Sequence, residues 1–147
     1  MKQWKSSGVN NKMRRKNRFT NWEYPEIIDG VPTKYNWVVQ NKSSFRLGFG
    51  VDIGAFTYIN AKFGVIIKEN VQIGSHCSIY SVSTIDNKHG EVILERDSCI
   101  GSHSTILPGV TIGKNSIIGA HSFVTKSIPN NVIAMGVPAK IYKKLDE

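Results

Sequence analysis

The strongest constraint on the fold is an aliphatic residue that recurs every six positions near the C-terminal end. The recurring residues are Ile100, Ile106, Ile112, Ile118 and Val124. A helix repeats its apolar residues every three to four positions, and a half-buried strand repeats them every two. A period of six therefore indicates a stacked repeat, in which each unit forms one side of a coil. Three units complete a coil of about eighteen residues, and its inner side chains stack on those of the next coil.

The same period continues upstream, where it is interrupted twice. Ile53 and Ile59 share one register, whereas a second register contains Ile67, Ile73, Ile79 and Ile85. The breaks fall around residues 61–65 and 85–92, and the second has the polar sequence TIDNKHGEV. We expect the backbone to leave the coil at both places. Segments outside a rigid scaffold commonly carry reactive groups.

Composition and charge limit the classes of protein that this sequence can represent. The 147 residues suit one domain, and a hydrophobic share of 40% is ordinary for a globular protein. No apolar run approaches the roughly 20 residues of a membrane span, and the N-terminus lacks a secretory apolar region. We therefore expect a cytoplasmic protein. Of the net charge of +8, residues 1–18 contribute +7. We interpret this segment as a solvated or subunit-packing tail, with an arm for an anionic partner such as RNA as the alternative.

These patterns predict an all-β parallel β-helix organised as a single domain. Residues 1–46 form a basic N-terminal arm and a capping segment, 47–129 form the β-helix, and 130–147 form a C-terminal cap. In this cap we expect a short basic helix over residues 139–145. Cys77 and Cys99 lie in separate units without the spacing of a metal site, so we expect both to be reduced and structural.

The C-terminal half resembles a known family. The sequence CIGSHSTILPGVTIGKNSIIGAHSFVTKSIPNNVIAMGVPAKI over 99–141 is similar to the end of the galactoside, maltose and related sugar acetyltransferases, which are hexapeptide-repeat acyltransferases. The run AKFGVIIKENVQIGSHCSIY over 61–80 resembles their middle coils. The resemblance implies a left-handed β-helix, a homotrimer, acetyl-CoA (coenzyme A) as co-substrate and no metal.

The resemblance also implies a coenzyme A groove between neighbouring subunits. Its expected contacts are Gly101, Ser102, Ala120, Thr125, Lys126, Lys140 and Lys143. Ser102 and Ala120 would meet the pantetheine arm through their backbones, and an N–H near Gly101 or Ser102 would stabilise the thioester oxyanion. Thr125 and the lysines would lie near the nucleotide and its phosphates, which a compact ammonium suits. A solvated end cap is the alternative for the lysines.

His89 is the expected general base, because an imidazole can accept the proton that an attacking amine or hydroxyl loses near neutral pH. It lies in the second break, and the family carries its catalytic histidine in a comparable excursion. Asp86 would hold the other ring nitrogen, with a solvated carboxylate as the alternative. The fourth position of three units is also histidine, at His76, His103 and His121. We expect these to stack along one edge, as a ladder at the subunit interface or as a channel lining in which His103 contacts substrate. One of the three is the alternative base.

The acceptor is expected to contact Asn60 and Lys62, which flank the first break. Alignment through Ala61 and Phe63 places Lys62 where the sugar acetyltransferases carry a substrate-contacting asparagine. A lysine favours an anionic acceptor, and we expect N-acetylation of a nucleotide-linked amino sugar in surface polysaccharide (lipopolysaccharide) synthesis. Sugar O-acetylation is the alternative. Two further readings are a γ-carbonic-anhydrase-like metalloprotein and a nucleic-acid-binding scaffold. Acceptor identity, acyl length and N- versus O-transfer stay open.

Overall fold

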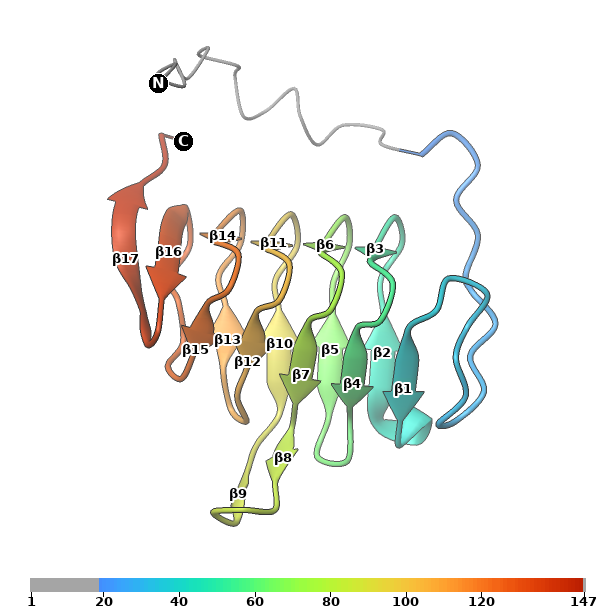
Figure 1. Ribbon diagram of the computed structural model, residues 1–147. Coiled ribbons are helices and arrows are strands. Elements are labelled where there is room, and N and C mark those ends of the chain that lie inside the picture. The colour runs from blue at the N-terminus through green and yellow to red at the C-terminus, as the bar shows by residue number, and fades with distance from the viewer. Residues whose placement is uncertain (1–18, 147) are drawn as a thin grey trace, which may run out of the picture.

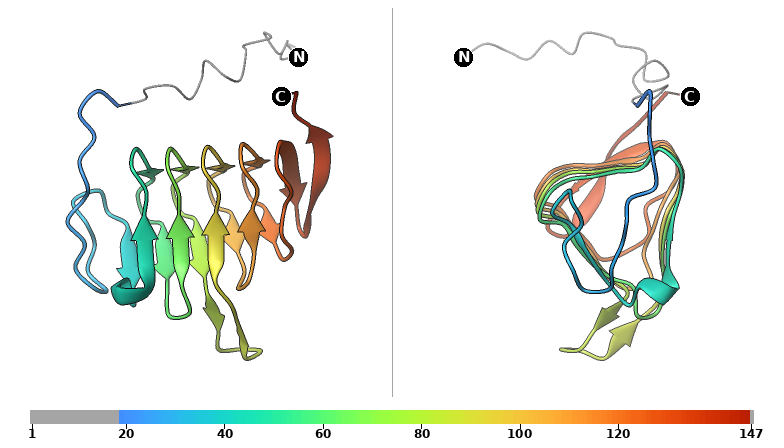
Figure 2. Two further views of the ribbon diagram at one scale, coloured as in Figure 1. Left: turned by 180° about the vertical axis from the view of Figure 1, so that it is seen from behind. Right: turned by 90° about the vertical axis from the view of Figure 1, so that its right-hand side faces the viewer.

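The computed structural model describes residues 19–146, which form a prism of three β-sheets (Figure 1). The chain visits the three sheets in a fixed order, so neighbouring strands in a sheet come from successive coils. Viewed along its axis, the prism has a roughly triangular outline (Figure 2). The pairing between coils is parallel throughout the stack, which confirms the predicted parallel β-helix.

Each sheet makes one side of the prism, and we call these sides faces 1, 2 and 3. Face 1 contains β1 (Val38–Gln40), β4 (Tyr58–Asn60), β7 (Ser78–Tyr80), β12 (Thr105–Ile106) and β15 (Phe123–Val124). Face 2 contains β2 (Phe45–Leu47), β5 (Val65–Ile67), β10 (Val92–Leu94) and β13 (Thr111–Ile112). Face 3 contains β3 (Asp52–Ile53), β6 (Gln72–Ile73), β11 (Cys99–Ile100), β14 (Ile117–Ile118), β16 (Val132–Gly136) and β17 (Ala139–Lys144). A short 3-10 helix, η1 (Lys42–Ser44), connects β1 to β2.

The residues of the six-residue period form the core. Ile100 pairs with Ile118 in face 3, and Ile106 pairs with Val124 in face 1. All four side chains are buried. Because the partners are eighteen residues apart, the ladders follow directly from three six-residue units per coil. One coil cannot cover its own inner face, so burial depends on its neighbours in the stack.

Glycine is required where successive coils touch through their backbones. A Cβ on Gly101 would lie 2.4 Å from the backbone nitrogen of Ala120. A Cβ on Gly113 would lie 2.3 Å from the carbonyl carbon of Pro129. No side chain fits at such distances, so these glycines set how closely the coils stack.

Both predicted interruptions of the repeat are present. The first is a turn between β4 and β5, and the second is a hairpin of β8 (Val82–Ser83) and β9 (Lys88–His89) that projects from the prism (Figure 1). The assignment of Ile85 to the repeat register was wrong, because Ile85 lies on this hairpin and is 98% exposed. Its six-residue spacing from Ile79 is a coincidence, since the backbone leaves the prism before reaching it.

The stack begins earlier than the predicted start at Leu47. β1 pairs in parallel with β4, so the first coil includes Val38–Gln40. Trp37 precedes this strand and is buried in the core, as expected of an aromatic residue that closes the first coil. Tyr24 and Tyr35 remain exposed. The basic arm over 1–18 lies outside the described residues.

The predicted C-terminal helix is wrong, because residues Ala139–Lys144 form strand β17. β17 pairs antiparallel with β16 and closes the end of face 3 (Figure 1). A helix would leave the N–H and C=O groups along the outer edge of β16 without strand partners. Ile141 and Tyr142 also favour a strand by intrinsic preference. The lysines of the segment, which suggested a helix end, instead lie exposed along the edge strand.

Candidate active site

Three sets of turns form the edges of the prism, and the predicted site residues occupy two of them. The excursion edge follows face 1 and comprises residues 61–64, 81–91, 107–110 and 125–127. The histidine edge precedes face 1 and comprises residues 54–57, 74–77, 101–104 and 119–122. The third edge joins faces 2 and 3 and comprises residues 48–51, 68–71, 95–98, 113–116 and 129–131.

The excursion edge brings His89 against the first interruption. The imidazole of His89 stacks on the ring of Phe63, with centroids 4.5 Å apart and an angle of 28° between the planes. The ammonium of Lys62 lies over the same ring, with Nζ 5.9 Å from its centroid. All three side chains are exposed. The expected base and the expected acceptor-binding lysine thus share one aromatic neighbour.

Asn60 belongs to the same group through backbone geometry. Its Oδ1 accepts hydrogen bonds from the Lys62 N–H at 3.2 Å and from Nδ2 of Asn41 at 3.1 Å. These bonds orient the side-chain amide at the end of β4, where the chain turns toward Phe63. The structure therefore gathers Asn60, Lys62 and His89, which the sequence analysis had proposed for two different roles.

Asp86 contacts Lys88 instead of the imidazole. One carboxylate oxygen lies 3.2 Å from Nζ of Lys88. A hydrogen bond from the Ser83 side chain, and then the interactions with Lys88, lower the pKa of Asp86 below its ordinary value. Both partners are exposed to solvent, so the pair stabilises the hairpin only weakly. In the single chain, Asp86 acts on the hairpin turn and does not orient His89.

The histidine edge carries the predicted ladder. The rings of His76 and His103 stack with centroids 4.7 Å apart, and those of His103 and His121 with centroids 4.8 Å apart. Phe56 extends the column, 5.1 Å from His76. The three histidines have φ of 57° to 59°. This left-handed conformation is uncommon for residues other than glycine, asparagine and aspartate.

The residues expected to contact the pantetheine arm also lie on the histidine edge. The Gly101 N–H donates to the carbonyl of Ile118 at 2.8 Å, and the Ser102 carbonyl accepts from the His121 N–H at 2.9 Å. Ala120 occupies the position after Gly119 in the next coil, and its side chain is exposed. Small side chains at Ser102 and Ala120 leave the backbone of this edge accessible to an extended ligand.

The expected nucleotide-binding residues are divided between the two edges. Thr125 and Lys126 follow β15 on the excursion edge and are exposed. Lys140 pairs with Met135, which approaches Gly119 at the histidine edge. Lys143 pairs with Ile133, farther along β17. Within one chain, face 1 therefore separates His89 from Ser102 and Ala120.

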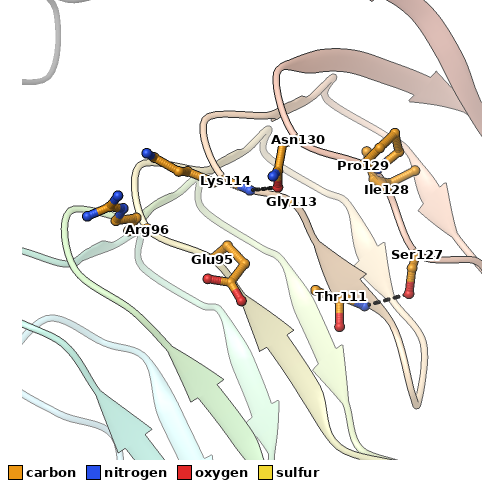
Figure 3. Close-up of a pocket in the computed structure, with 9 residues that line it drawn as sticks. All are labelled: Glu95, Arg96, Thr111, Gly113, Lys114, Ser127, Ile128, Pro129 and Asn130. Carbon is orange, nitrogen blue, oxygen red and sulfur yellow. Dashed lines mark hydrogen bonds between the residues drawn. The ribbon is translucent and has the colours of Figure 1, made fainter.

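Two features of the surface escaped the sequence analysis. Phe63 served there only as an alignment landmark, although it is the aromatic residue of its turn. A hollow on face 2 and the third edge is lined by Glu95, Arg96, Thr111, Gly113, Lys114, Ser127, Ile128, Pro129 and Asn130 (Figure 3). Its polar groups serve the fold: Ser127 Oγ accepts from the Thr111 N–H, and Asn130 Oδ1 accepts from the Lys114 N–H. No group of residues conspicuous in the sequence marks this hollow.

Metal-binding and membrane-spanning features were also searched. Over residues 19–146, no three histidine, cysteine or acidic side chains gather closely enough to hold a metal ion. The described part of the chain likewise contains no helix of the length and apolarity needed to cross a membrane.

Comparison with known proteins identifies the repeat. Residues 91–126 match the family model described as bacterial transferase hexapeptide (six repeats). Galactoside O-acetyltransferase of Escherichia coli K12 is 36% identical over 118 residues, covering 70% of this chain and 58% of that protein. The enzyme of the same name from Lactococcus lactis is 34% identical, covering 68% of this chain and 56% of that protein. The chain thus spans little more than half the length of these curated relatives.

Solved structures share the architecture. The hexapeptide-repeat acetyltransferase VCA0836 of Vibrio cholerae, complexed with acetyl coenzyme A, superposes with a TM-score of 0.72 at 25% identity, covering 76% of this chain and 66% of that chain. AntD, an N-acyltransferase from Bacillus cereus in complex with dTDP and coenzyme A, gives a TM-score of 0.66 at 23% identity, covering 78% of this chain and 80% of that chain. The likeness to AntD shows a common fold.

Proposed function

Because residues 91–126 carry the hexapeptide repeats of the bacterial transferases, we propose that this chain transfers an acetyl group from acetyl-CoA to an amino group of a nucleotide-linked sugar. The relatives named galactoside O-acetyltransferase support an acetyltransferase with a sugar acceptor. The acetyl-CoA complex of VCA0836 supports the donor. The repeats also imply the left-handed form of the β-helix.

The observation that carries the proposal is the group formed by His89, Phe63, Lys62 and Asn60. An amine that attacks the thioester carbonyl forms a C–N bond and must lose a proton, while the C–S bond breaks. His89 takes that proton and returns it to the departing thiolate, so no covalent enzyme intermediate is needed. Neither Cys77, which is buried, nor Cys99, on face 3, is placed beside this group.

The histidine edge is proposed to hold coenzyme A. Its small residues allow the pantetheine arm to approach the backbone, and Lys140 lies beyond Ala120 as a partner for phosphate oxygens. Thr125, Lys126 and Lys143 are further proposed contacts at the nucleotide end. Because the Gly101 N–H is already engaged by Ile118, the Ser102 N–H is the better candidate for the oxyanion donor.

A homotrimer would complete the site. His89 and the proposed coenzyme contacts occupy different edges of one chain, so the base must meet the thioester of a neighbouring copy. A closed ring of three copies places the excursion edge of each against the histidine edge of the next. In this arrangement, the stacked column of His76, His103 and His121 lies along the subunit interface, and His103 is the member expected nearest the substrate.

The acceptor is proposed from charge. Lys62 and Lys88 lie on either side of His89 along the chain, and Lys62 contacts the Phe63 ring that supports the base. Two ammonium groups beside the base favour an acceptor with phosphate groups, as in a sugar nucleotide of surface polysaccharide synthesis. AntD, whose fold is similar, is named as an N-acyltransferase and was solved with dTDP. O-acetylation of a sugar hydroxyl is the second candidate, because both curated relatives above carry that activity in their names.

The test is release of free coenzyme A from acetyl-CoA, measured with a panel of nucleotide-linked amino sugars, nucleotide-linked neutral sugars and free galactosides. Turnover with the amino-sugar nucleotides alone is expected. His89→Gln should then lower kcat by about 10²- to 10⁴-fold with little change in the KM of acetyl-CoA. Matched replacements of His76, His103 and His121 are the comparison. A larger loss in any of them would move the base from His89, and turnover of free galactosides alone would establish the O-acetyl alternative.

Lys62→Gln tests the acceptor separately. It should raise the KM of the sugar nucleotide and leave the KM of acetyl-CoA unchanged. Lys34→Gln is the control, because Lys34 is an equally exposed lysine that contacts an aromatic ring, Tyr35, near the other end of the stack. Equal effects of the two replacements would show that charge in general, and not Lys62, attracts the acceptor.

A further inference from the structure

The two segments that meet at the excursion edge are joined by one buried residue. Ser81 is fully buried, and its Oγ accepts a hydrogen bond from the Phe63 N–H at 3.0 Å while donating to the Asn60 carbonyl at 2.7 Å. The Ser81 carbonyl accepts the Gly90 N–H at 2.9 Å. Ser81 therefore fixes the turn that carries Phe63 to both strands at the base of the hairpin that carries His89.

The position of the imidazole nevertheless depends on a short element. β9 contains only Lys88 and His89, and its partner β8 contains only Val82 and Ser83. A hairpin of this length is marginal by itself. The His89 side chain is exposed, and the ring of Phe63 is the aromatic surface against which it rests. Without that surface, the imidazole would be free to turn about its side-chain torsions in solvent.

We propose that Phe63 is a positioning residue for the general base, a role that rests on the function proposed above. Its ring holds the plane of the His89 imidazole at one orientation and contacts Lys62 as well. The base and the acceptor-binding ammonium are therefore held relative to each other by a single side chain. Phe63 acts through these two residues and takes no part in proton transfer.

Nuclear magnetic resonance tests the positioning without any activity. The chain contains four histidines, all within the described residues, so His89→Gln identifies the His89 ring signals by their disappearance. Stacking on an aromatic ring displaces these signals by ring current. Phe63→Leu should move them toward the values of the unfolded chain, whereas Phe63→Tyr should retain them. The signals of His76, His103 and His121 serve as internal controls and should not move.

Kinetics tests the consequence. Phe63→Leu should lower kcat about ten- to a hundredfold, because a misplaced base loses much of its effect. Phe63→Tyr should restore most of that loss, and the KM of acetyl-CoA should be unchanged in both. Phe49→Leu is the matched control, since Phe49 is an exposed phenylalanine in contact with Trp22 on the third edge.

The outcomes separate the two proposals. His89 signals that stay in place in Phe63→Leu would overturn the positioning role, as would a kcat equal to that of the unsubstituted protein. If His89→Gln keeps full turnover, the proposed base fails, while the resonance measurement still decides whether Phe63 orients the ring.

Discussion

The imidazoles of His103 and His121 lie face to face, with centroids 4.8 Å apart and an angle of 5° between their planes. The spacing equals the distance between adjacent strands of a sheet, because each histidine occupies the same corner of successive coils. Both residues are held at positive φ. Such a conformation costs roughly 1–3 kcal/mol for a residue other than glycine, so the surrounding coil must impose it.

Replacement of His103 therefore tests the corner. His103→Asn should change the free energy of unfolding by less than about 1 kcal/mol, because asparagine tolerates the left-handed region. His103→Val should lower it by about 1–3 kcal/mol, since a β-branched side chain is strained there. Urea unfolding at one fixed protein concentration compares the two, and equal losses would show that the conformation is not the source of the effect.

Close contact of coil backbones makes a second prediction. Gly113→Ala should lower the free energy of unfolding by at least about 3 kcal/mol, because the added Cβ meets the backbone of Pro129 and Asn130. Gly109→Ala is the control: its φ is +80°, but no atom lies within 4 Å of the added Cβ. It should lose only about 1–2 kcal/mol. A Gly113→Ala protein as stable as Gly109→Ala would contradict the tight stacking.

The two isoleucines Ile106 and Ile85 should respond oppositely to truncation. Ile106 is fully buried in the ladder of face 1, so Ile106→Ala should lower the free energy of unfolding by about 2–5 kcal/mol. Ile85 is 98% exposed, and Ile85→Ala should stay within about 0.5 kcal/mol. Thermal or urea unfolding measures both. A large loss at Ile85 in the assembled protein would reveal that a second copy covers the hairpin.

Cys77 predicts a dependence on alkaline pH. Burial raises the pKa of its thiol above the ordinary value of 9.0. As the pH rises past that value, the unfolded chain loses the proton while the native state keeps it, so the free energy of unfolding should fall. Cys77→Ala should weaken this fall, and Cys99→Ala should preserve it. A thiol reagent should modify Cys99 in the native protein and Cys77 only after unfolding, and rapid modification of both would contradict the burial of Cys77.

The sequence predicted those parts of the fold that depend on the repeat itself. The spacing of Ile100, Ile106 and Ile112 determines which side chains point inward, and the spacing of His103 and His121 determines their stacking. Local period could not show that Ile85 belongs to a hairpin, because a residue at the right interval looks the same inside and outside the coil. It also could not show that Ala139–Lys144 forms a strand, since that choice is made by the open edge of β16.

The candidate site was predictable in its members and less so in their partners. Residue type and the interruptions of the repeat pointed to His89, Asn60 and Lys62, which the structure gathers at one edge. The partner of His89 is Phe63, whereas Asp86 pairs with Lys88. These contacts depend on how a turn and a hairpin from successive coils approach each other, and no sequence interval encodes that approach.

A site shared between copies can be tested by complementation. His89→Gln removes the proposed base, and Ala120→Trp fills the histidine edge where coenzyme A is proposed to lie. Each variant alone should be inactive. Proteins coexpressed with two different affinity tags and purified through both contain mixed oligomers, and each active site then needs His89 from one chain and an open edge from its neighbour.

The most direct measurement of the account is therefore the rate of coenzyme A release by this mixed preparation. If equal amounts of the two chains assemble at random in a closed ring, roughly a quarter of the sites combine both intact halves, so activity should return to roughly that fraction of the unsubstituted protein. A mixture as inactive as its two parents would contradict the shared site, because it would show that the base and the coenzyme groove belong to the same chain.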